Sequence, residues 1–152
     1  MSTQRVLFVC THNSARSQMA EGMLRAMGGG DFEAFSAGTE AGKLRPEAIA
    51  VMGEVGIDIN GQESKTLERF HAQPFDWVIT VCDDARESCP VFPGVDQTAH
   101  WGVEDPAEVN GSEARRLEAF RQARDDLRNR IRLFIATARR ADVAHPVETP
   151  GA

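Results

Sequence analysis

Short apolar runs alternate with longer amphipathic stretches along most of the chain. Residues 5–10 and 75–81 are rich in β-branched and aromatic side chains, which is typical of strands buried in a parallel sheet. Residues 32–37, closed by Gly38, predict another strand, and residues 97–101 predict a short fourth one.

Helical patterns separate and follow these runs. The first predicted helix ends at three glycines, residues 28–30, and carries the apolar positions Met19, Met23, Leu24 and Met27. Pro46 opens a second helix, which ends at Gly56. Residues 66–71 predict a further short helix. Ser112 is expected to cap the longest helix, whose apolar positions fit a 3.6-residue period: Leu117, Phe120, Leu127, Ile131, Phe134 and Ile135.

This alternation predicts one α/β domain over residues 1–140, a parallel sheet with helices on both faces. Residues 141–152 contain two prolines and a glycine without periodicity, so they predict a flexible tail. Ligands of such sheets bind outside the carboxyl ends of the strands. Cys10 and Cys82 lie at two predicted carboxyl ends, and one crevice could therefore hold both.

Charge and cysteine content narrow the function. The net charge of −6 argues against a nucleic-acid binder or a membrane-surface protein, which usually need a basic face. No apolar run approaches the ~20 residues that span a bilayer, and the first nine residues lack the order of a signal peptide. We therefore expect a cytoplasmic protein. Three cysteines in a reducing compartment favour catalytic or redox use over a static disulfide framework.

A candidate oxyanion loop joins the first strand to the first helix. Its residues are Cys10, Thr11, His12, Asn13, Ser14, Ala15, Arg16 and Ser17. A loop of this length can turn its N–H groups inward, and the helix N-terminus adds a positive dipole end. Arg16 can grip two oxygens of a tetrahedral anion. These surroundings favour a Cys10 thiolate, to which Ser17 can donate. The alternative is an inert buried cysteine with a surface arginine.

The stretch from Val6 to Gly22 resembles the low-molecular-weight protein tyrosine phosphatase superfamily, and in particular its thioredoxin-coupled arsenate reductase branch. The resemblance continues through residues 36–38, 55–57, 80–82 and 101–106, and it covers roughly residues 5–135. It implies a four-stranded parallel sheet flanked by helices. It also implies that residues 11–17 bind arsenate, with phosphate or sulfate as mimics.

The resemblance further implies that Asp105 protonates the departing oxygen, because the family carries an Asp-Pro at Asp105-Pro106. Taken alone, an Asp-Pro pair is a frequent turn opener. Glu104 and Glu108 are the competing carboxylates.

Cys82 and Cys89 separate reductase from phosphatase chemistry, because arsenate reduction needs two electrons that thiols can supply. The segment 83–90 predicts a two-turn helix, on which positions seven apart lie ~10.5 Å apart along the axis. A disulfide needs Cα atoms within ~7 Å, so this helix would have to unwind before the two could join. The resemblance implies a relay from Cys10 to Cys82 to Cys89, recycled by thioredoxin. The alternatives are two buried structural cysteines or a zinc site, which this spacing fits poorly.

Three other functions compete with this one: a low-molecular-weight tyrosine phosphatase, a reductase that uses a small thiol, and an oxyanion-binding redox sensor. The chain has no tyrosine, and residues 105–109 offer no aromatic side chain to frame a phenyl ring. We still expect weak aryl phosphatase activity. We also expect a monomer with no bound cofactor or metal.

Some relatives hold potassium beside the loop, and Asn13, Glu21 and Ser64 fit that pattern. Lys65 stands where a ligating carboxylate would be. We hypothesise that its ammonium replaces the ion, so that activity needs no potassium.

Overall fold

The computed structural model describes residues 3–83, 95 and 97–144, with side chains up to residue 140. The elements in chain order are β1 (Gln4–Cys10), α1 (Arg16–Gly28), η1 (Gly29–Asp31), β2 (Phe32–Gly38), α2 (Pro46–Glu54), η2 (Leu67–Phe70), β3 (Trp77–Thr80), β4 (Gln97–His100), η3 (Pro106–Glu108) and α3 (Glu113–Ala144).

The four strands form one parallel sheet in the order β2-β1-β3-β4. This confirms the predicted fold class. The chain leaves β1 toward one edge of the sheet for β2 and then returns to the other side of β1 for β3. Such a reversal marks the topological switch point, where ligands of open α/β sheets bind. The carboxyl ends of β1 and β3 therefore define the expected site.

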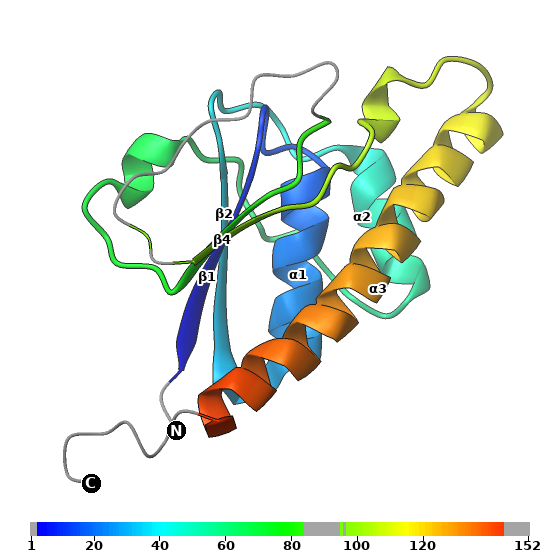
Figure 1. The fold of residues 1–152 in the computed structure, drawn as a ribbon. Coiled ribbons are helices and arrows are strands. Elements are labelled where there is room, and N and C mark those ends of the chain that lie inside the picture. The colour runs from blue at the N-terminus through cyan, green and yellow to red at the C-terminus, as the bar shows by residue number, and fades with distance from the viewer. Residues whose placement is uncertain (1–2, 84–94, 96, 145–152) are drawn as a thin grey trace, which may run out of the picture.

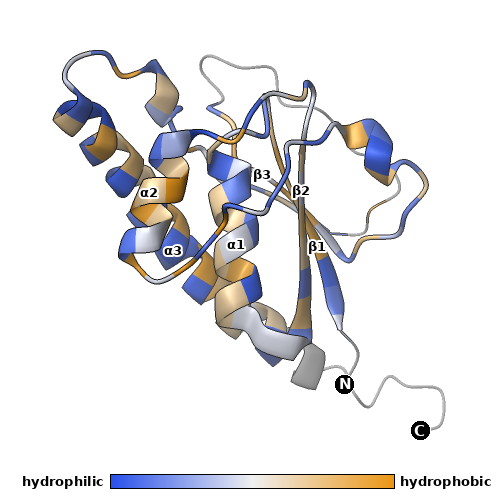
Figure 2. Ribbon diagram, turned by 180° about the vertical axis from the view of Figure 1, so that it is seen from behind, coloured by the Kyte–Doolittle hydropathy of each residue, from blue (hydrophilic) through white to orange (hydrophobic). Residues whose placement is uncertain are grey.

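The sheet separates two apolar clusters, and α1, α2 and α3 lie together on one side of it (Figures 1 and 2). Val6 and Phe8 face α1, α2 and α3, which all pack on one side. Leu7 and Val9 face the other side, where η2 and the loop after it supply Phe70 and Phe75. All four strand residues are fully buried, as the alternation of side chains along a strand between two covered faces requires. The three α-helices thus share one face. Among the described residues, η2 and the loop after it cover the other face, so the expectation of helices on both faces is met there by a 3-10 helix alone.

Several predicted boundaries shift by a few residues. β3 is limited to Trp77–Thr80, and the short helix expected over residues 66–71 is a 3-10 helix, Leu67–Phe70. The predicted cap of α3 is confirmed, because the Arg115 N–H donates to the Ser112 hydroxyl. Gly56 follows α2 in the left-handed region, at φ +78°.

The last helix runs past the boundary expected from the sequence. α3 continues to Ala144, beyond the expected boundary at residue 140, because the helix-breaking residues of that stretch begin only at Pro146. Residues 145–152 of the predicted tail lie outside the described residues. Within the described part, no helix is both long and apolar enough to cross a membrane.

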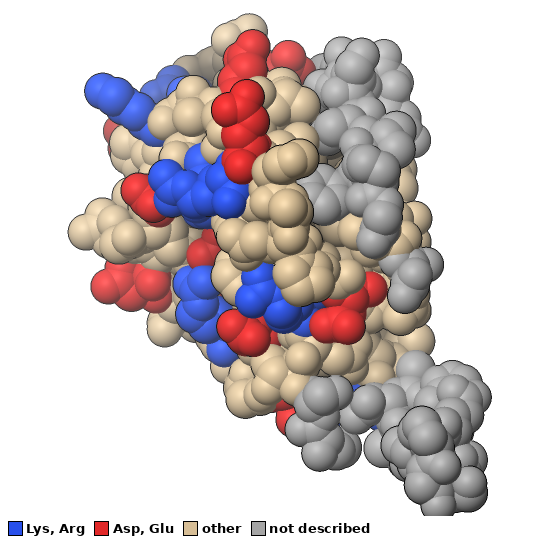
Figure 3. Space-filling view, turned by 90° about the vertical axis from the view of Figure 1, so that its left-hand side faces the viewer, with Lys and Arg blue, Asp and Glu red and all other residues tan. Residues whose placement is uncertain are grey.

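The surface charge on one side of the molecule is mixed. Figure 3 shows Lys and Arg side chains interleaved with Asp and Glu on the face that it presents. Attraction of an anion on this face would therefore depend on local geometry rather than on an extended field.

Candidate active site

The loop after β1 is held in an unusual conformation by its neighbours. Asn13 adopts φ +50°, in the left-handed region that asparagine tolerates better than most residues. The Thr11 carbonyl accepts from the Glu40 N–H at 3.0 Å, and the Ser14 carbonyl accepts from the Arg45 N–H at 2.9 Å. The segment after β2 thus fixes two points of the loop.

Gly38 permits this close approach. A Cβ at that position would lie 2.6 Å from the Thr11 carbonyl oxygen and 2.8 Å from the Asn13 nitrogen. Both are backbone atoms that cannot move aside without reshaping the loop. The glycine predicted to close the second strand therefore also makes room for the oxyanion loop.

The predicted loop residues differ in exposure. His12 is exposed and lies 3.2 Å from Glu40, whereas Thr11 and Ser14 are half-buried. Asn13, Ala15, Arg16 and Ser17 are buried, as is Cys10.

Cys10 is a free thiol whose sulfur lies 2.8 Å from the Ser17 hydroxyl. The direction of this hydrogen bond follows from its neighbours. The Asn13 Oδ1 accepts from the Lys65 backbone N–H at 2.8 Å, so its Nδ2 faces Ser17 and donates to that hydroxyl at 2.8 Å. The Ser17 oxygen is thus already an acceptor, which leaves its proton for the Cys10 sulfur. A donor aimed at the sulfur stabilises its thiolate form.

Arg16 connects the oxyanion loop to two other segments. Its guanidinium donates to the Val103 carbonyl at 2.9 Å and to the Val81 carbonyl at 3.4 Å. Its Nη2 lies 3.6 Å from Asp105 Oδ2, and its side chain is 3% exposed. Bonds to two carbonyls orient the planar guanidinium, which is the geometry needed for two-point contact with an oxyanion.

Asp105 is placed by the short helix that follows it. Its Oδ1 accepts from the Ala107 N–H at 2.9 Å and so caps η3, and its Oδ2 faces Arg16. The side chain is 18% exposed, whereas Glu104, which precedes it, and Glu108, the last residue of η3, are exposed. Of the three carboxylates considered, Asp105 combines partial burial with the ion pair to Arg16.

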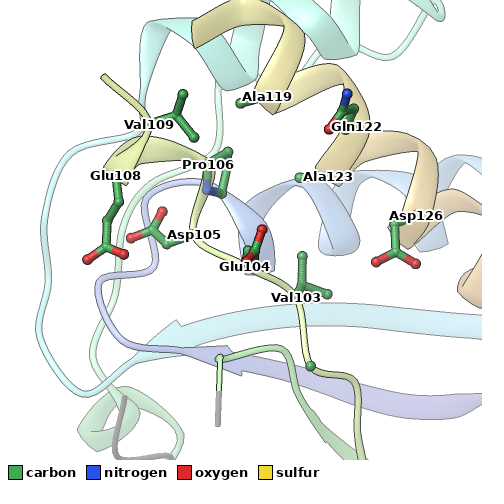
Figure 4. A pocket seen from close by; sticks show the side chains of 11 residues that line it. Val103, Glu104, Asp105, Pro106, Glu108, Val109, Ala119, Gln122, Ala123 and Asp126 are labelled. Carbon is green, nitrogen blue, oxygen red and sulfur yellow. The ribbon is translucent and has the colours of Figure 1, made fainter. Parts of the chain in front are cut away.

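Two cavities meet at Asp105. One, of about 450 Å³, lies between this loop and α3 and contains Glu104, Glu108 and Asp126 (Figure 4). The other, of about 480 Å³, contains Lys43 and Arg45 together with the loop residues His12 and Ser14. Charge alone makes the second cavity the more favourable of the two for an anion, because Lys43 and Arg45 line it beside Asp105, whereas the charged residues that line the first are carboxylates. Neither lining includes Cys10.

Cys82 lies beside the end of β1. It is fully buried and disulfide-bonded, and its sulfur is 3.8 Å from the Val9 carbonyl oxygen. The preceding residue is fixed to the same carbonyl, since the Val81 N–H donates to it at 2.8 Å. The structure therefore brings Cys82 to the residue next to Cys10. Cys89 and most of the predicted helix 83–90 lie outside the described residues.

A buried ion pair lies beneath the loop. Lys65 Nζ is 3.6 Å from Glu21 Oε1 and donates to the Glu63 carbonyl at 2.6 Å. Burial lowers the pKa of Lys65, and Glu21 opposes this shift. These residues do not fit a potassium ion, because the ammonium already lies against the carboxylate that would bind it.

Ser64, which fits the potassium pattern of relatives, bonds to the oxyanion loop rather than to Glu21. Ser64 donates to the His12 carbonyl and accepts from the Gly42 N–H, so it braces the loop from outside. Ser36 is the hydroxyl that donates to Glu21, at 2.5 Å. Sequence patterns missed Ser36 because it lies within a strand, where only its inward direction marks it as part of the site. They also missed the two carbonyls that orient Arg16, since backbone acceptors leave no signal in a sequence.

Comparisons with known proteins agree with this geometry. The family model described as low molecular weight phosphotyrosine protein phosphatase matches residues 5–144. An arsenate reductase from Oceanobacillus iheyensis is 42% identical over 137 residues, which cover 90% of this chain and 99% of that protein.

Solved structures give the same picture. An arsenate reductase in its phosphate-binding state matches with a TM-score of 0.77 at 38% identity, covering 89% of this chain and 98% of the other. A thioredoxin-dependent arsenate reductase from Corynebacterium glutamicum matches with a TM-score of 0.60 at 28% identity, covering 87% of this chain and 63% of the other.

Proposed function

We propose that this chain, which belongs to the low molecular weight phosphotyrosine protein phosphatase family, reduces arsenate to arsenite. One observation carries the proposal. A free Cys10, whose sulfur contacts the Ser17 hydroxyl, shares its loop with the oriented Arg16 and lies beside a second cysteine that is disulfide-bonded. A phosphatase would use the first cysteine alone, whereas a reductase needs a sulfur that can change its redox state.

Binding would rest on the loop of residues 11–17 and on Arg16. The guanidinium and the helix N-terminus supply positive charge where the oxyanion's negative charge lies. Phosphate and sulfate have a similar shape and charge, so we expect them to compete with arsenate. The relative whose structure is in a phosphate-binding state supports this expectation.

The first chemical step is attack of the Cys10 thiolate on arsenic(V). A sulfur–arsenic bond forms, an arsenic–oxygen bond breaks, and Asp105 gives a proton to the departing oxygen, which leaves as water. Cys82 then attacks the Cys10 sulfur as a thiolate. The sulfur–arsenic electron pair stays on arsenic, which leaves as arsenite, and a Cys10–Cys82 disulfide remains.

Recycling follows by thiol–disulfide exchange. Cys89 attacks Cys82, which frees Cys10 and forms a Cys82–Cys89 disulfide that thioredoxin reduces. A free Cys10 beside a disulfide-bonded Cys82 is the combination expected at the end of this relay. The thioredoxin-dependent relative supports the choice of reductant. Thiol recycling of this kind requires a reducing compartment, so we place the protein in the cytoplasm.

A coupled assay tests the proposal. NADPH oxidation is followed with thioredoxin, thioredoxin reductase and arsenate, and arsenite is measured separately. The wild type should consume NADPH continuously. Cys89→Ser should release about one arsenite per protein and then stop, since the Cys10–Cys82 disulfide has no resolving thiol. Continuous turnover by Cys89→Ser with thioredoxin would overturn the relay.

The family match makes phosphatase activity the second candidate. Hydrolysis of an aryl phosphate without arsenate-dependent NADPH use would favour it. Neither activity, combined with arsenate binding, would favour a redox sensor instead.

A further inference from the structure

We propose that an ordered chain of hydrogen bonds, running from Arg25 through Gln62, Gln18 and Asn13 to Ser17, sets the reactivity of Cys10. Gln18 is its positioning residue. The inference rests on Cys10 as the nucleophile of the proposed function, and it adds residues that do not touch the substrate.

The outer half of the chain has a fixed direction. Arg25 has only donors, and its Nη1 donates to Gln62 Oε1 at 3.3 Å. The Gln62 oxygen is therefore the acceptor, and its Nε2 donates to Gln18 Oε1 at 2.7 Å and to the Gln18 carbonyl at 3.0 Å. The Gln18 amide is thus oriented with its oxygen outward and its nitrogen toward the oxyanion loop.

The inner half continues in the same direction. Gln18 Nε2 donates to the Asn13 carbonyl and to Asn13 Oδ1, both at 3.0 Å, and to the Glu63 carbonyl at 2.8 Å. Asn13 Nδ2 then donates to Ser17, whose hydroxyl donates to Cys10. The Lys65 N–H, which also donates to Asn13 Oδ1, independently requires the same orientation of that amide.

Every amide in this chain donates toward the sulfur. Such aligned hydrogen bonds polarise one another, and the effect is greatest where water is excluded. Gln18 is fully buried and Asn13 is too, so the last links lie away from solvent. Gln18 also grips both the backbone and the side chain of the one loop residue with positive φ. Its loss should let Asn13 relax and weaken the donor at Cys10.

Alkylation of Cys10 measures this effect without arsenate or thioredoxin. In protein carrying Cys82→Ser and Cys89→Ser, only Cys10 reacts with iodoacetamide, and the rate against pH reports its thiolate. Gln18→Met keeps the side-chain length but removes the amide. We expect the midpoint of the profile to rise by about one pH unit, so that alkylation below the midpoint slows about tenfold. Gln62→Met should shift the midpoint in the same direction by less.

Gln4→Met is the matched control. Gln4 lies at the other end of β1, where its amide donates to the Ala138 carbonyl and accepts from Trp77. This variant should lower thermal stability and leave the alkylation midpoint unchanged.

An unchanged midpoint in folded Gln18→Met overturns the proposal, as does an equal shift in Gln4→Met. If Gln18→Met does not fold, Gln62→Met decides by the same criterion. Because no substrate is used, failure of this chain is distinguishable from failure of the reductase assignment.

Discussion

The ends of β1 and β3 are neighbours in the sheet, yet the cysteines found there are held differently. Cys10 is followed by a loop in which backbone, amide and hydroxyl groups are bonded to one another, and its sulfur receives a hydrogen bond. Cys82 is already part of a disulfide, and its sulfur lies 3.8 Å from the Val9 carbonyl oxygen on the adjacent strand.

This difference separates two chemical tasks. An attacking thiolate must be ready before the substrate arrives, so rigid donors around it are useful. A relay sulfur must change partners, which a network of fixed bonds would oppose. Arg16 connects the end of β1 to the end of β3. It follows the loop after β1, and its guanidinium donates to the carbonyl of Val81, the residue after β3.

The largest effect on activity should come from replacing Cys10 and Cys82 by serine, one at a time. Cys10→Ser should abolish both arsenate reduction and aryl phosphate hydrolysis, since a serine hydroxyl is a far weaker nucleophile at neutral pH. Cys82→Ser should abolish arsenate-dependent NADPH oxidation but retain most of any phosphatase activity. The measurement is the rate of arsenate-dependent NADPH oxidation and the rate of aryl phosphate hydrolysis for each of the two variants. Equal loss of phosphatase activity in both would contradict the division of tasks.

Asp105→Asn tests the acid that faces the loop. Asparagine can still accept from the Ala107 N–H and cap η3, so the loop should keep its shape while the proton donor is lost. We expect arsenite formation to fall about 100-fold, the lower range for general acid catalysis, with a smaller change in KM. Glu104→Gln, on the exposed neighbour, is the control. A greater loss in Glu104→Gln would reassign the acid.

The sequence predicted the parts of this site that depend on chain order. Cys10 and Cys82 were expected at one edge because parallel strands present their carboxyl ends together, and the structure places both there. The loop residues were found because cysteine, arginine and serine follow one another at fixed spacing. Pattern and helix propensity also located α3, since its apolar stripe is long.

Contacts between distant segments were not predictable in this way. Ser36 approaches Glu21 through the packing of α1 on β2, and Val103 meets Arg16 through a loop that has no periodic pattern. Ser64 and Ser36 illustrate this, because Ser64 lies in a polar stretch and Ser36 within an apolar strand, yet Ser36 is the one whose side chain reaches Glu21. Tertiary packing decides this contact.

The ion pair between Lys65 and Glu21, which lies beneath the oxyanion loop, should make the reaction rate independent of potassium. Lys65 already places a cation beside Glu21, so replacing sodium by potassium in the assay should change the rate less than about twofold. Outside the site, sodium and potassium at equal concentration screen the protein's charges equally. Lys65→Ala should lower kcat/KM several-fold, and potassium should then restore part of it. A strong potassium activation of the wild type would show that the ammonium does not replace the ion.

The smallest effect should come from a charge cluster far from both strand ends. Glu54 bonds to Arg121 and Arg124 and so ties α2 to α3, and these hydrogen bonds lower its pKa from 4.5 to about 2. A carboxyl with a lowered folded-state pKa stabilises the fold above pH 4.5 and loses that contribution as the pH falls toward 2. Glu54→Gln should therefore lower Tm at pH 7 by about 2 °C, in line with a solvent-screened surface pair. The difference from wild type should vanish as the pH approaches 2, and reductase activity at pH 7 should stay the same. Thermal unfolding monitored by circular dichroism across this pH range is the measurement. A fall in activity larger than the fall in stability would show that the helix layer, and not only the two strand ends, controls the chemistry.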